Sequence, residues 1–111
     1  MYNLLLDAHG TTDEGMELVR TIDPTRVRKI SVELENNAIA LGYSGGPAEL
    51  TLTLDDGTTI TIINGFGVGY KGTGPWGIHD ILKEDFHLSE DEASEVFKPY
   101  TGFLNFSVSV R

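Results

Sequence analysis

Residues 65–79 bring glycines, aromatic rings and a basic side chain together in one short segment. The segment holds six glycines, the only tryptophan of the chain, and a proline at position 75 where a helix can begin. A glycine-rich turn between a strand and a helix lets the backbone approach a ligand or a partner closely. Amides at the helix start can hold an anion, and aromatic rings can stack on a base or a guanidinium. The candidate binding residues are Phe66, Tyr70, Lys71, Thr73, Trp76 and His79.

The named nucleotide motifs do not account for this loop. Residues 67–72 satisfy a G-x-G-x-x-G search, but that motif requires a parallel βαβ unit, which the surrounding pattern does not predict. No Gly-Lys-Ser/Thr ends the loop, so it is not a P-loop. The alternative reading is structural: the glycines allow a tight turn, and Phe66 and Trp76 close the end of the core.

No other segment carries an enzyme mechanism. Residues 42–46 match the G-x-S-x-G pattern of serine hydrolases, but the next segment predicts a strand where those enzymes need a helix. Asp7 and His9 lie on one face at a strand end, whereas His79 and His87 are eight residues apart and do not converge on a metal from one helix. The sequence therefore predicts no catalytic residue, no metal and no cofactor. A metal-dependent enzyme using His9 or His79 is the remotest alternative.

The net charge and the cysteine content limit the kinds of partner and the cellular compartment that we expect for this protein. The chain has 17 acidic and 8 basic residues, a net charge of −9, which disfavours binding to nucleic acid through phosphates. An acidic surface favours a basic protein partner, although solubility alone also explains the charge. The absence of cysteine excludes disulfides and indicates a reducing compartment, so we expect a cytoplasmic protein. The candidate partner interface consists of Asp85, Glu90, Asp91, Glu92 and Glu95.

Alternating apolar residues predict strands at residues 30–34, 39–43, 50–54 and 104–110. β-Branched residues predict a strand at residues 58–63, and the short apolar segment 1–6 is interpreted as a further strand. Capping-box spacing predicts helices that begin at Thr11 and Ser89, and Pro75 marks a third helix start. Residues 1–111 are expected to form a single α+β domain. Its antiparallel sheet has about five to six strands, with two to three helices packed on one face. No apolar stretch approaches the roughly 18 residues of a membrane span, and no signal peptide is predicted.

Residues 68–82 resemble a Gly-Tyr-Gly-Gly-Ser/Thr-Gly-Pro motif found, followed by a short helix, in small uncharacterised bacterial and phage domains. The resemblance covers about 15 of the 111 residues, and Lys71 stands where the motif has glycine. It implies a microbial origin and a cytoplasmic setting, and it supplies no reaction.

These observations predict a small acidic binding protein without catalytic activity. The leading hypothesis is an immunity-type, antitoxin-type or host–phage-conflict inhibitor that blocks a basic partner through the loop 66–76 and the acids of residues 85–95. The alternative is a small-ligand binder of phage or bacterial origin that sequesters a nucleotide signal at the helix start near Pro75. The last strand is also a candidate edge for pairing with a second copy of the chain.

Overall fold

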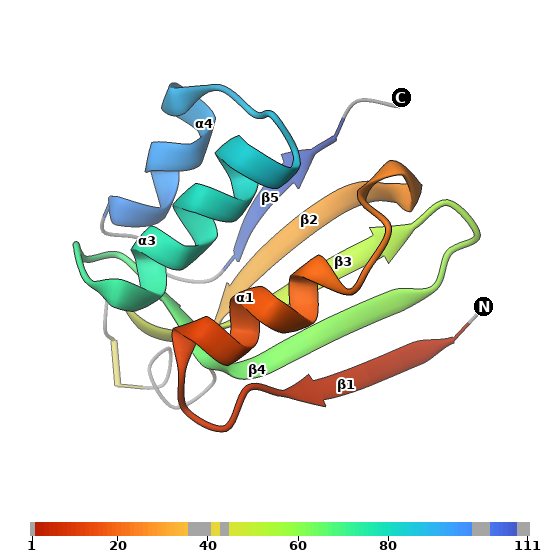
Figure 1. Ribbon diagram of the computed structural model, residues 1–111. Helices are drawn as coiled ribbons and strands as arrows, with labels where there is room; N and C mark the ends of the chain where they lie inside the picture. Colours follow the sequence, from red (N-terminus) through yellow and green to blue (C-terminus); the bar gives the residue numbers. More distant parts are fainter. Residues whose placement is uncertain (1, 36–40, 43–44, 99–102, 109–111) are drawn as a thin grey trace.

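The computed structural model describes residues 2–35, 41–42, 45–98 and 103–108, which form a five-stranded sheet with helices on one face (Figure 1). The strands lie in the order β1-β4-β3-β2-β5. Their bounds are β1 Asn3–Asp7, β2 Val27–Leu34, β3 Gly46–Leu54, β4 Thr59–Val68 and β5 Phe103–Ser107. The predicted α+β class is confirmed.

The sheet is mixed, which corrects the expectation of a wholly antiparallel one. β1 pairs with β4 in parallel, from Asn3 opposite Thr59 to Asp7 opposite Ile63, while the other pairs are antiparallel. Alternation reports which face of a strand is buried but not the direction of its neighbour, so this pairing was not readable from the pattern. Of the strand expected at residues 39–43, Leu41 and Gly42 lie in a turn, and the remainder falls outside the described residues.

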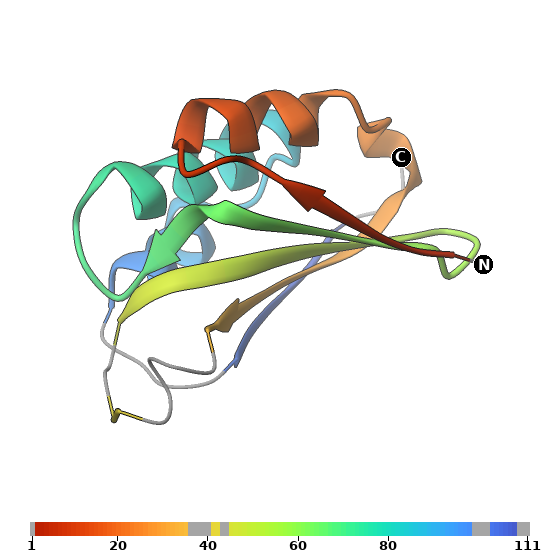
Figure 2. The ribbon, with the colours of Figure 1, turned by 90° about the horizontal axis from the view of Figure 1, so that it is seen from below.

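The helices all cover the same face of the sheet (Figure 2). Helix α1 (Thr12–Arg20) and helix α3 (Thr73–Asp80) both pack on β4 and on each other. α3 continues into a π-helical turn (Ile81–Asp85), followed by the short helix α4 (Glu90–Ala93) and a 3-10 turn (Ser94–Phe97). A further 3-10 turn (Pro24–Arg26) precedes β2. In the part of the chain that the structure describes, no helix is long and apolar enough to cross a membrane.

Two of the predicted helix starts are set by side-chain caps. The Thr11 side chain accepts a hydrogen bond from the Glu14 amide, and Ser89 forms a complete capping box with Glu92. These bonds satisfy amides that the first helical turn leaves without a partner. The third start, predicted near Pro75, falls at Thr73, and its cap Gly72 contributes no side-chain bond.

The core lies between the helices and alternate residues of the central strands. Its largest fully buried side chains on the sheet are Val27, Ile30, Val32, Leu34, Leu50, Leu52, Ile62 and Val68. Phe66 is only 5% exposed, and its ring fills the space where α1 and α3 meet β4. A Cβ at Gly15 of α1 would lie 2.8 Å from this ring, so the glycine permits the close approach of helix and strand.

Candidate functional site

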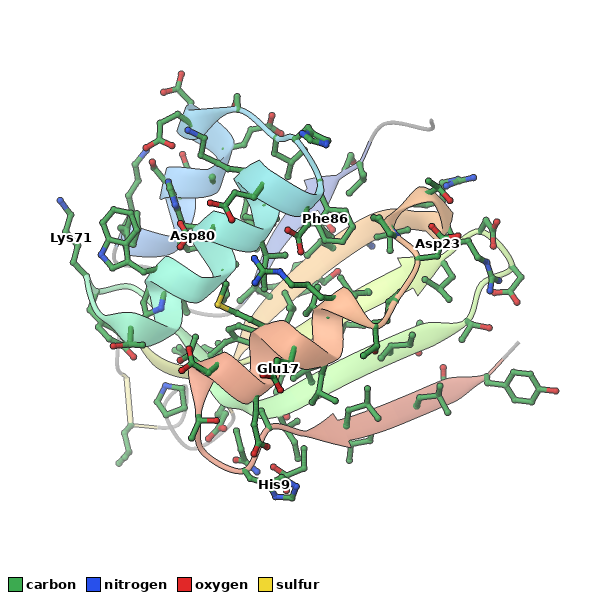
Figure 3. All side chains as sticks on the ribbon, in the orientation of Figure 1. His9, Glu17, Asp23, Lys71, Asp80 and Phe86 are labelled. Atoms are coloured by element: carbon green, nitrogen blue, oxygen red, sulfur yellow. The ribbon has the colours of Figure 1, made fainter. Side chains whose placement is uncertain are left out.

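The structure divides the six candidate binding residues between the core and the surface. Phe66 and His79 are buried, at 5% and 6% exposure. Tyr70 and Trp76 remain 45% and 46% exposed, and Lys71 and Thr73 are exposed as well. Figure 3 shows Lys71 extending away from the fold. Phe66 and His79 therefore lie in the interior, and only Tyr70, Lys71, Thr73 and Trp76 of the six are exposed.

Trp76 lies in a hollow between α1 and α3 that we call the interhelical groove. The groove has a volume of about 500 Å³. Its lining residues are Thr12, Asp13, Met16, Gly72, Thr73, Trp76, Gly77 and Asp80. Asp13 comes from the first turn of α1, and Asp80 is the last residue of α3. Among the described residues Asp13 has no ion-pair partner, and Asp80 pairs only with His79.

The indole of Trp76 is held in place from behind by two other rings. It meets the His79 imidazole edge-on, with centroids 4.9 Å apart, and the Phe97 ring at 4.6 Å. The first ring belongs to α3 itself and the second to the 3-10 turn Ser94–Phe97. These contacts hold the exposed part of the indole in one orientation toward the groove. Because the side chain is already ordered, it would lose little conformational entropy when a partner binds.

His79 connects α3 to α4 and positions Trp76. Its Nδ1 lies 3.1 Å from Asp80 Oδ1, and its Nε2 lies 2.9 Å from Glu90 Oε2. Lys83 Nζ lies 3.1 Å from the same Glu90 oxygen. Hydrogen bonding from His79 and then from Lys83 holds the pKa of Glu90 below its usual value. These contacts explain the buried histidine without any ligand.

Because Glu90 links α4 to His79 and Lys83, we expect the stability of the protein to decrease at acidic pH. A carboxylate with a lowered pKa in the folded state adds stability above its unfolded pKa, about 4.5, which is lost as the pH falls through the folded value. We expect the urea midpoint of the wild type to fall from pH 5 toward pH 3, and Glu90→Gln to flatten that dependence. The matched control is Glu17→Gln on α1, because the described residues offer Glu17 no side-chain partner. Equal flattening in both variants would contradict the assignment to Glu90.

Most of the predicted acidic interface is engaged within the domain. Asp85 pairs with Arg20 of α1 at 3.3 Å, and Glu95 pairs with Lys98 at 2.9 Å. Glu92 caps α4, and Glu90 holds His79. Asp91 alone makes no side-chain hydrogen bond or ion pair with a described residue. On the helix side of the sheet, the carboxylates of Asp13, Glu14 and Glu17 on α1 form no ion pair with a described residue, and the sequence interpretation did not select them.

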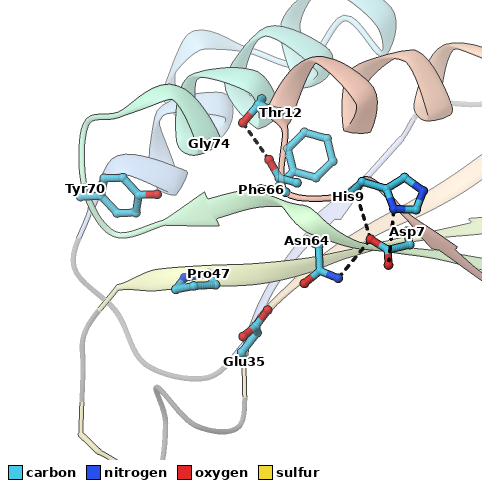
Figure 4. Close-up of a pocket in the computed structure, with 11 residues that line it drawn as sticks. Asp7, His9, Thr12, Glu35, Pro47, Asn64, Phe66, Tyr70 and Gly74 are labelled. Carbon is cyan, nitrogen blue, oxygen red and sulfur yellow. Dashed lines mark hydrogen bonds and ion pairs between the residues drawn. The ribbon is translucent and has the colours of Figure 1, made fainter.

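A second hollow lies at one edge of the sheet, and we call it the strand-end pocket (Figure 4). Its volume is also about 500 Å³. Its polar side chains are Asp7, His9, Thr12, Glu35, Asn64 and Tyr70. Sequence patterns placed Asp7 and His9 at the end of a strand, but they did not select Glu35 or Asn64 as site residues. No group of three or more histidine, aspartate or glutamate side chains within the described ranges is placed to hold a metal ion.

Asp7 lines the strand-end pocket, and its carboxylate is held by two hydrogen bonds. Its Oδ1 accepts hydrogen bonds from the His9 backbone N–H at 2.8 Å and from Asn64 Nδ2 at 3.0 Å. These bonds hold the pKa of Asp7 below its usual value, the His9 amide contributing most. His9 and Asn64 both have left-handed backbones, with φ of 54° and 59°. Such conformations are uncommon outside glycine, although asparagine and histidine adopt them more readily than most residues.

Comparison with known proteins supplies no relative. No family model, no curated protein and no solved structure matches the chain. The resemblance of residues 68–82 to small bacterial and phage domains therefore stays a prediction, and function has to be argued from the two hollows and the charge around them.

Proposed function

We propose that the chain is a non-catalytic acidic protein that binds a basic protein partner through its helix layer. The observation that carries the proposal is the interhelical groove, where an exposed, fixed indole lies in a hollow that two carboxylates also line. Aromatic anchors of this kind dominate the energetics of many protein interfaces.

The charge distribution supports the same surface. Residues 12–20 and 73–97 contain ten of the 17 acidic residues and two of the eight basic ones, so these segments carry eight of the nine net negative charges. Both segments lie on the helix side of the sheet (Figures 1 and 2). A surface with one dominant sign attracts a partner of the opposite sign and speeds their encounter.

The groove suits an arginine or lysine side chain of that partner. The cation would lie over the Trp76 indole, while its N–H groups donate to the carboxylates of Asp13 and Asp80. Charge-assisted hydrogen bonds to a planar guanidinium also specify orientation. Within this class we propose an inhibitor of the immunity or antitoxin kind, which covers a basic active-site surface of its partner.

The same residues disfavour the nucleotide alternative. A phosphate at the start of α3 would share the groove with the Asp13 carboxylate, and Pro75 has no amide hydrogen to donate. The only lysine of the loop, Lys71, extends away from the fold (Figure 3). The groove thus favours a cationic group over an anionic one.

The test is a quantitative capture experiment with matched charge variants. Tagged wild-type protein should retain a basic protein from the native source, and that protein, once purified, should bind with a Kd measured by calorimetry. Trp76→Ala and the double variant Asp13→Asn/Asp80→Asn should each weaken binding at least tenfold, a typical hot-spot loss.

The control is Glu33→Gln/Glu49→Gln, which removes the same two charges from the open face of the sheet. These two residues lie opposite each other on β2 and β3, so their neutralisation removes a like-charge contact. Binding should remain within twofold of the wild type. An unchanged Kd in the groove variants, or an acidic partner, would exclude this function.

A further inference from the structure

The strand-end pocket lies beyond the ends of β1 and β2, beside the irregular middle part of β4. β1 and β4 are parallel, and β2 runs in the same direction because it is antiparallel to β3, which is antiparallel to β4. Asp7 is the last residue of β1, Glu35 directly follows β2, and Asn64 occupies an irregularity in β4. Crevices beyond the carboxyl ends of strands are a common place for ligands in open sheets with parallel strands.

The irregularity in β4 aims Asn64 into this pocket. Between the pairs Leu50–Ile62 and Ala48–Phe66, β3 has one residue and β4 has three. Such a bulge breaks the alternation of side chains and redirects one of them. With its amide nitrogen donating to Asp7, Asn64 keeps its carbonyl oxygen as a hydrogen-bond acceptor (Figure 4).

The two carboxylates of the pocket, Asp7 and Glu35, are also hydrogen-bond acceptors. Asp7 uses one oxygen for both of its internal hydrogen bonds, and its other oxygen lies 4.0 Å from His9 Nδ1. The backbone of Glu35 is fixed by its N–H donating to the Pro47 carbonyl at 3.0 Å, while its carboxylate has no hydrogen bond or ion pair within the described residues. The pocket thus holds two carboxylates and an amide oxygen, with His9 at its exposed rim.

Tyr70 forms an aromatic wall that two glycines make room for. A Cβ at Gly72 would lie 2.6 Å from the Tyr70 ring, and a Cβ at Gly67 would collide with the Tyr70 hydroxyl. In Figure 4 this hydroxyl points from the loop toward the pocket. Gly67 and Gly72, two of the six glycines of residues 65–79, therefore leave the space that the Tyr70 ring occupies.

We infer that the strand-end pocket binds a small organic cation that carries an ammonium or guanidinium group. The two carboxylates and the Asn64 oxygen accept its N–H donors, and the Tyr70 ring contacts its carbon chain. A volume of about 500 Å³ is within the range of small-molecule sites. This site is separate from the interhelical groove, since the two hollows share only Thr12 in their linings.

The experiment titrates isotope-labelled protein with agmatine and follows the amide resonances of His9, Asn64 and Gly65. Agmatine carries both cationic groups on a four-carbon chain. We expect saturable shifts at these residues, and none with AMP or inorganic phosphate. Glu35→Gln should weaken agmatine binding at least tenfold, and because no described residue pairs with this carboxylate the variant should fold. Asp7→Asn should act in the same direction.

Two controls separate this inference from the proposed function. Trp76→Ala and Glu33→Gln/Glu49→Gln should leave the agmatine Kd reported by the His9, Asn64 and Gly65 shifts unchanged, whatever their effect on a protein partner or on cation binding in the interhelical groove. A capped arginine, N-acetyl-arginine amide, distinguishes the source of the cation. Preference for agmatine indicates a free small molecule, and preference for the capped residue indicates a basic side chain of a protein. No saturable shift with either probe at millimolar concentration, or an unchanged Kd in Glu35→Gln, would overturn the inference.

Discussion

Replacing Phe66 with alanine is expected to lower the free energy of unfolding by about 3–5 kcal/mol. The side chain is 5% exposed, and its ring lies against Gly15 of α1 and Gly77 of α3. Glycine neighbours have no side chains that could move into the vacated space, so the cavity would stay largely open. Urea unfolding followed by circular dichroism measures the loss, and an unchanged m-value would show that two-state unfolding is preserved.

The matched control is Phe103→Ala, which deletes the same atoms at a surface position. Phe103 on β5 is 53% exposed, and its ring lies 6.0 Å from Lys29 Nζ. Its removal should cost less than about 1 kcal/mol, the usual range for exposed side chains plus a weak cation–π contact. Similar losses in both variants would mean that the Phe66 ring does not join the helices to the sheet.

The elements were predictable from the sequence where the signal is local. Alternating residues on β2 and β3 report the buried face directly, and Thr11 and Ser89 cap helices that begin where they were expected. The predicted end of β4 at residue 63 was too early. Asn64 interrupts the alternation at the bulge, which obscures the fact that Phe66 continues the buried set of Ile60 and Ile62.

The candidate sites were less predictable because they depend on which strands are neighbours. Asp7, Glu35 and Asn64 are far apart in sequence, and only the parallel course of β1 and β4 brings them to one pocket. Ion pairs between different helices or strands could not be predicted from the sequence either. The acids at residues 85–95 appeared available for a partner, but Arg20 and His79 pair with two of them, Asp85 and Glu90, from other helical segments.

Replacing Gly74 with alanine is expected to destabilise the protein by about 2–3 kcal/mol, within the range of overpacking. Gly74 lies in the first turn of α3, and a Cβ there would lie 2.7 Å from the Gly67 backbone nitrogen and 3.2 Å from the Phe66 carbonyl carbon. Backbone atoms cannot rotate away as a side chain can. The helix would have to move off β4, which also loosens the packing on Phe66.

Gly72→Ala is the informative comparison, because the same methyl group meets a side chain there. Its Cβ would lie 2.6 Å from the Tyr70 ring, which is 45% exposed and free to swing outward. We expect a loss below about 1 kcal/mol, together with weaker agmatine binding as the aromatic wall is displaced. Thermal and urea unfolding of both variants checks the order. If Gly72→Ala were the more destabilising, the contact between α3 and β4 would not be what requires glycine at position 74.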